Sequence, residues 1–123
     1  MKYMLLTYGP AEVWDTESFT EEGREQMRQM IDFMNELNDD LTSSGVLVAA
    51  EGLTGPQDAR TVRWIDEEAV TTDGPYAESK EFLAGYWVVD VPALEQAADI
   101  AARVVRYVKA PIEIRPVGEA PDL

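Results

Sequence analysis

The sequence contains neither cysteine nor histidine among its 123 residues. Without cysteine the chain can form no disulfide, no thiolate metal site and no cysteine nucleophile. Without histidine it has no serine–histidine triad, no histidine-bound zinc and not the usual general base near neutral pH. Any acid–base chemistry must therefore use aspartate, glutamate, lysine or tyrosine side chains whose pKa values are moved by burial or by neighbouring charges.

Positive charge and long apolar runs are also scarce. The chain has 10 lysine and arginine residues against 24 aspartate and glutamate residues, which gives a net charge of −14. Such a field repels nucleic-acid phosphates and anionic lipid, so we expect neither nucleic acid nor a membrane as a partner. The chain has no run of about 20 apolar residues, the length that would span a bilayer. Its first residues also lack the long apolar region of a signal peptide. We therefore expect a cytoplasmic protein.

Hydrophobic residues make up 46% of the chain, which is enough for a packed core in one domain over residues 1–123. Ser18 and Glu21 fit a capping box at the start of a first helix, and Gly45 fits its C′ position. A second helix is expected between Pro92, which suits a first turn, and Pro111. Apolar runs and turn signals predict a buried strand at 46–50 and further strands at 2–8, 60–65, 69–73, 84–91 and 112–117.

This order, β-α-β-β(β)-β-α-β, matches a ferredoxin-like α+β fold, an antiparallel sheet with both helices on one face. The strand at 84–91 is mostly apolar on both sides, with Trp87 and Val89 on one and Tyr86 and Val88 on the other. A sheet covered on one face only should instead alternate apolar with polar residues. We therefore expect a homodimer packed sheet to sheet about a two-fold axis.

The segment Asp73-Gly74-Pro75-Tyr76-Ala77-Glu78-Ser79-Lys80 lies between two predicted strands. Pro75 fixes its own φ and restricts the residue before it, while Gly74 relieves crowding there. Asp73 is placed to cap the backbone N–H groups of the turn. One interpretation is a well-made turn and nothing more. The other is a rigid loop that holds Asp73 and the Glu78–Lys80 pair at the mouth of a cavity.

Two further residues are candidates for the same site. Glu51 ends an apolar strand, so its carboxylate lies either at the sheet rim or partly buried, where it would serve as an acid or base. Tyr86 could offer a hydroxyl to a cavity from its strand. The alternatives are surface ion pairs for Glu78, Lys80 and Glu51, and core or interface packing for Tyr86. The sequence has no phosphate loop, dinucleotide fingerprint or EF-hand spacing, so we expect no cofactor and no metal.

Several of these segments together resemble a known family. The run at 73–81 followed by Gly85-Tyr86 resembles the signature of the DGPF-type, YCII-related proteins, with Tyr76 in place of the usual phenylalanine. Supporting segments are Lys2–Leu6, Gly45–Leu53 and Glu113–Val117. The resemblance covers nearly the whole chain. It implies a ferredoxin-like fold of the dimeric α/β-barrel type, with Asp73, Glu78 and Lys80 at the motif's aspartate, acid and base.

The resemblance leaves two functions open. The YCII branch has a histidine–aspartate pair associated with catalysis, which this chain cannot reproduce because it lacks histidine. The first hypothesis is a dimer that binds a small metabolite near Asp73, Glu78, Lys80, Tyr86 and Glu51 and transfers a proton. The second is a non-enzymatic accessory protein, linked to extracytoplasmic-function sigma factors, whose acidic first helix meets a basic partner. In a third interpretation the motif only shapes the fold.

Overall fold

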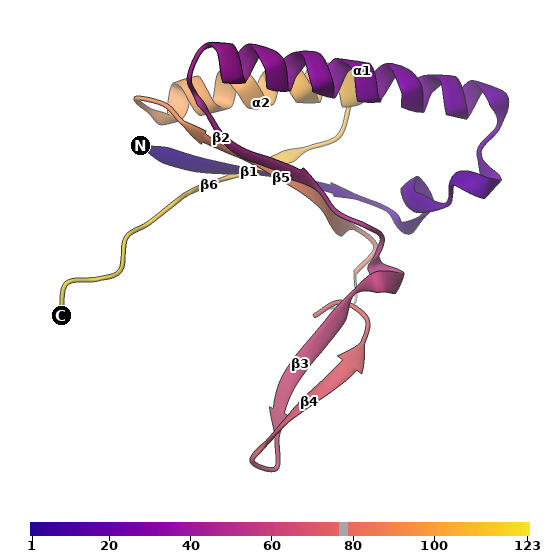
Figure 1. Cartoon of the computed structure of the whole chain (residues 1–123), viewed down its shortest axis with the longest axis vertical. Coiled ribbons are helices and arrows are strands. Elements are labelled where there is room, and N and C mark those ends of the chain that lie inside the picture. The colour runs from indigo at the N-terminus through magenta and orange to yellow at the C-terminus, as the bar shows by residue number, and fades with distance from the viewer. Residues whose placement is uncertain (77–78) are drawn as a thin grey trace.

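The computed structural model describes residues 1–76 and 79–123, and Figure 1 shows its helices on one side of a sheet. Within these residues the strands are β1 (Lys2–Gly9), β2 (Leu47–Gly52), β3 (Arg60–Ile65), β4 (Glu68–Asp73), β5 (Phe82–Asp90) and β6 (Ile112–Pro116). The α-helices are α1 (Glu21–Ser43) and α2 (Leu94–Val108). Short 3₁₀ turns lie at Ala11–Trp14, Thr16–Ser18 and Pro56–Asp58.

Four of the strands form an antiparallel sheet in the order β2-β5-β1-β6. This strand order, with both helices on one face, is the ferredoxin-like α+β fold, so the predicted fold class is confirmed. The core lies between the sheet and the helices, where Leu5, Val89, Leu37 and Val104 are fully buried. No helix among the described residues has the length and apolar character needed to cross a membrane.

The start of α1 differs from the prediction. Ser18 belongs to a 3₁₀ turn and its hydroxyl donates to the Asp15 carboxylate at 2.7 Å, so the capping box at Ser18 and Glu21 is wrong. Thr20 is the N-cap, because its side-chain oxygen accepts the Gly23 backbone N–H at 3.0 Å. At the other end Gly45 adopts φ +76°, which confirms the predicted C′ glycine.

Two other predictions also differ from the structure, one on the burial of a strand and one on the start of a helix. Strand β2 was predicted to be buried, but it is an edge strand with a register irregularity between Leu47 and Ala49, and Val48 is half exposed. Helix α2 begins at Leu94 with Ala93 as N-cap, so Pro92 precedes the helix instead of occupying its first turn. The helix ends at Val108, and its C-cap Lys109 adopts a left-handed conformation two positions before Pro111.

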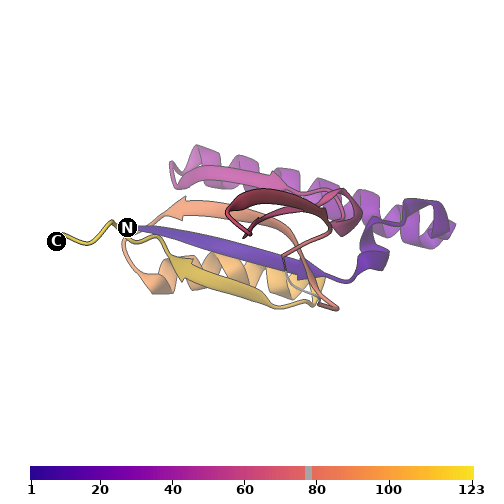
Figure 2. The same cartoon turned by 90° about the horizontal axis from the view of Figure 1, so that it is seen from below.

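Strands β3 and β4 form a hairpin, which we call the arm (residues 60–73). Its turn residues Asp66 and Glu67 both have positive φ, as a tight two-residue hairpin turn requires. The arm pairs only with itself among the strands that the structure describes. Figure 1 shows it projecting away from the sheet on the side opposite the helices, and in Figure 2 it stands in front of the sheet with the helices behind.

The face of the four-stranded sheet that the helices leave uncovered is called here the open face. The strand register places nine side chains on it: Met4, Leu6, Tyr8, Ala49, Glu51, Tyr86, Val88, Glu113 and Arg115. Six of these nine are apolar or aromatic. The two-sided apolar character expected from the sequence is therefore present on the folded sheet.

Candidate functional site

The Asp73–Tyr76 turn is fixed at the root of the arm. Gly74 has φ +99°, a conformation that side chains disfavour, and its N–H donates to the Ala59 carbonyl at 2.9 Å. The Thr61 hydroxyl donates to the Gly74 carbonyl at 2.8 Å. Both partners come from the opposite limb of the hairpin, so pairing of the two strands sets the position of the turn.

Asp73 forms an ion pair with Arg60 at the root of the arm. Its Oδ1 is 3.1 Å from Nε of Arg60, the residue opposite it in the strand register, and its side chain is 93% exposed. An ion pair this exposed contributes under about 1 kcal/mol to stability. The Asp73 carboxylate thus pairs with Arg60 in water, and no hydrogen bond from the turn's backbone to it is found among the described residues, so the predicted cap is not formed there.

An open hollow of about 450 Å³ lies beside this turn. Arg63 of β3 and Phe82 of β5 line it together with residues of the motif, namely Asp73, Gly74, Pro75, Tyr76 and Ser79. The Arg63 guanidinium lies 5.7 Å from the centre of the Tyr76 ring and donates to the Tyr76 carbonyl at 3.4 Å. An arginine held against an aromatic ring is suited to binding a small anion, because its donors match a carboxylate or phosphate.

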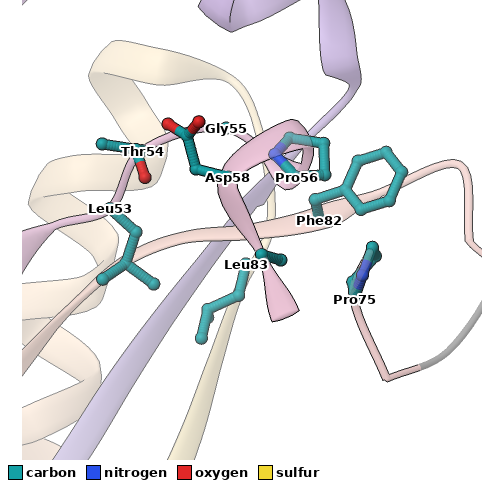
Figure 3. A pocket seen from close by; sticks show the side chains of 9 residues that line it. Leu53, Thr54, Gly55, Pro56, Asp58, Pro75, Phe82 and Leu83 are labelled. Carbon is teal, nitrogen blue, oxygen red and sulfur yellow. The ribbon is translucent and has the colours of Figure 1, made fainter. Parts of the chain in front are cut away.

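A second hollow, of about 290 Å³, lies on the other side of the loop (Figure 3). Leu53, Thr54, Gly55, Pro56, Asp58, Ala59, Pro75, Phe82 and Leu83 line it. Figure 3 shows Pro56 and Pro75 near the Phe82 ring, with Leu53 and Leu83 on the opposite, left-hand side of the view. Pro75 and Phe82 line both hollows, so the motif loop separates two neighbouring recesses.

Sequence reasoning missed Phe82 and the binding position of Arg63. The signal for Arg63 was its alternation with Val62 and Trp64 along β3, which places its side chain on the opposite face of the arm. Phe82 carries no local signal, because it reaches the hollow only when β5 has paired with β1 and β2.

Glu51 and Tyr86 form a separate group. They are direct neighbours across β2 and β5 on the open face, and Glu51 is exposed. Neither they nor Lys80, which is exposed in the loop before β5, are among the described residues that line the two hollows. Glu78 lies outside the described residues. The catalytic roles assigned to all five residues stay predictions.

A polar group also lies at the rim of the open face. The Tyr8 hydroxyl donates to Oε1 of Glu113 at 3.1 Å, and Oε2 of Glu113 is 3.3 Å from Nη1 of Arg115. Partial burial raises the pKa of the Tyr8 phenol above its ordinary value. The hydrogen bond to Glu113 and the charge of that carboxylate raise the same pKa, while Arg115 lowers it. Tyr8 is therefore a hydrogen-bond donor at neutral pH.

Among residues 1–76 and 79–123 no three acidic side chains converge in a way that could hold a metal ion. The chemistry that the described site can supply is anion binding by Arg63 and contact with the rings of Tyr76 and Phe82.

Comparison with known proteins identifies relatives along the whole chain. A family model described as YCII-related domain matches residues 1–120. "Uncharacterized protein R00369" of Rhizobium meliloti (strain 1021) is 29% identical over 129 residues, covering 99% of this chain and 100% of that protein. The match extends across both hollows, the arm and the open face.

Proposed function

The chain belongs to the YCII-related family, and from this premise we propose that it acts as a homodimer that binds a small metabolite beside the Asp73–Tyr76 turn. The observation that carries the proposal is the hollow of about 450 Å³, which the motif residues themselves line. That volume lies within the usual range for small-molecule sites, about 300–1,000 Å³. A turn shaped only to connect two strands would not need an arginine and two aromatic rings around it.

The lining favours a small anionic ligand with a flat or apolar part. Arg63 would bind a carboxylate or phosphate, while Tyr76 and Phe82 would contact the rest of the molecule. With such a ligand bound, we propose that Asp73 or Glu78 takes up a proton and that Lys80 stabilises the negative charge that develops.

The homodimer would pack open face against open face. Met4, Leu6 and Val88 then leave water, and Glu51 and Tyr86 come to lie at the interface. A second copy over Glu51 would exclude water from its carboxylate, which is the condition for a role of Glu51 as a general base. Dimerisation would thus dehydrate Glu51 and Tyr86, which form a second group apart from the described lining of the ligand hollow.

The test is a panel of small carboxylates and phosphates, screened by the rise in melting temperature and then by calorimetry. We expect a ligand that binds the wild-type protein and binds Arg63→Gln at least tenfold more weakly, because a charge-assisted pair contributes about 1.5–3 kcal/mol. Arg28→Gln is the matched control, since Arg28 is an exposed helix arginine paired with Glu25. Equal binding by both variants would refute the role of the hollow.

A non-enzymatic accessory role is the second candidate, and one feature of α1 favours it. An apolar groove of about 300 Å³ lies between α1 and the segment before it, lined by Val13, Phe19, Met27 and Met30 beside Glu12. Helix α1 itself begins with Glu21 and Glu22. A groove of methionines near acids would suit a basic amphipathic helix, for example in a regulatory protein associated with a sigma factor. Capture of such a partner at low salt and its release at moderate salt would support this role.

A further inference from the structure

The arm presents an apolar surface to solvent. Val62 and Trp64 point to one face of the hairpin, where Ala69 and Thr71 lie opposite them in the strand register. Trp64 is 73% exposed and Val62 64% exposed. Tryptophan exposed to this extent is unusual for a residue with so much apolar surface, and it marks a contact site.

The arm also lacks the support that a hairpin needs. A lone two-stranded hairpin is at best marginally stable in water, whereas packing against another layer stabilises it. The face carrying Arg63 is partly covered, since Arg63 contacts Tyr76 and the Thr61 hydroxyl donates to Gly74. The face carrying Trp64 has no comparable cover among the described residues, since Trp64 and Val62 stay largely exposed there.

The total exposed surface shows how much is left uncovered. A compact monomer of this mass exposes about 6,600 Å², whereas this chain exposes 8,948 Å². The excess, about 2,300 Å² per chain, falls within the range that each subunit of an extensive obligate dimer buries. The arm and the open face, which lie on the same side of the molecule in Figures 1 and 2, both contribute exposed surface, as do the exposed residues 117–123.

We infer that the arm is a clasp that lies against a second copy of this chain and buries Trp64 and Val62 on it. This inference rests on the proposed sheet-to-sheet homodimer and adds a second contact to it. A copy stacked on the open face lies beside the arm, because the arm projects on that side. The strip Val62, Trp64, Ala69 and Thr71 carries no charge, and the one charged pair next to it on this face, Arg60 with Asp73, is neutral as a pair. Two copies of an acidic chain can therefore meet there without repulsion.

The clasp would also fix one wall of the ligand hollow. Arg63 lies between Val62 and Trp64 in β3, with its side chain on the other face. A partner surface that packs against Trp64 would therefore also hold Arg63, and through Arg63 the Tyr76 ring, in place. In this arrangement the contact between the copies and the hollow of each copy share one strand.

The absence of cysteine permits a direct test by single-cysteine labelling of the full chain. Val62→Cys reports on the clasp, and Ile31→Cys, at a 51% exposed position of α1 on the helical side, is the matched control. Reaction with a thiol reagent is followed from dilute to concentrated protein, with sedimentation velocity on the same samples. We expect Val62→Cys to react at least tenfold more slowly in the dimer than in the dilute monomer, with the Ile31→Cys rate unchanged. Trp64→Ser should weaken the dimer at least tenfold.

The outcomes separate the two proposals. A dimer in which Val62→Cys stays as reactive as Ile31→Cys overturns the clasp and leaves the sheet-to-sheet dimer standing. A protein that stays monomeric at every concentration overturns both. If Trp64→Ser disrupts the hairpin itself, seen as a loss of its circular dichroism or melting transition, the Val62→Cys protection still decides the question.

Discussion

Gly85 is the residue at which the sheet tolerates least change. A Cβ built on it would lie 2.7 Å from the Glu51 carbonyl oxygen and 3.3 Å from the Gly52 Cα, both of them backbone atoms that cannot turn aside. We expect Gly85→Ala to lower the free energy of unfolding by about 1–3 kcal/mol, because β2 must shift on β5. Chemical denaturation followed by tryptophan fluorescence measures the change.

Gly52 is the control for this prediction, since it is the register partner of Gly85 and a Cβ there meets nothing within 4 Å. Gly52→Ala should leave stability unchanged or raise it by up to about 1 kcal/mol. Equal losses in the two variants would mean that β2 and β5 do not approach as described.

Sequence reasoning at the residue scale found the turn but not the chemistry around it. Gly74 and Pro75 were recognisable because their constraints are local, acting on φ and on crowding. Their neighbours in the hollow were not, since Phe82 and Pro56 reach the turn only through strand pairing. The Asp73 carboxylate was expected to cap the turn and instead pairs with Arg60 across the hairpin. Glu51 and Tyr86 were correctly placed on strands, but the open face that separates them from the hollow required the register.

At the scale of elements, the cap of α1 provides a test between the sequence pattern and the structure. Thr20→Ala removes the acceptor for the Gly23 N–H and should destabilise the protein by about 1 kcal/mol. Ser18→Ala removes only an exposed hydrogen bond to Asp15, so its cost should stay below about 0.5 kcal/mol. Thermal denaturation of both variants would contradict the structure if Ser18→Ala proved the more costly change.

The elements themselves were predictable wherever hydrophobic period and turn residues agreed. Gly45 ended the first helix as expected, and the strands predicted at 60–65 and 69–73 formed, with the second beginning one residue earlier at Glu68. What sequence could not provide was burial, because the apolar run at 46–50 would suit an interior strand equally well. Its edge position follows from the pairing order of four strands that are distant in the chain.

Considered as a whole, the molecule separates its charge from its apolar surface. The acids Glu21, Glu22, Glu25, Asp32 and Asp40 lie on α1, on the helical side of the sheet, whereas the open face is mostly apolar. Two copies that meet through the open face would thus keep their acidic helices on the outside. In the proposed dimer, association would therefore use the side of the molecule that carries less acid.

This separation predicts how salt acts on the proposed dimer. Each chain carries a net charge of −14, so two copies repel each other at long range. Raising the salt from about 10 mM to about 150 mM shortens the Debye length from about 30 Å to about 8 Å, which screens this repulsion but leaves apolar contacts intact. We expect the two copies to associate several-fold more tightly at the higher salt, as measured by sedimentation equilibrium.

The triple variant Glu21→Gln, Glu22→Gln and Glu25→Gln should show a smaller salt effect, because it carries less charge on the outer helix. A dimer that weakened with salt would instead be held by ion pairs, and the open face would not be its interface.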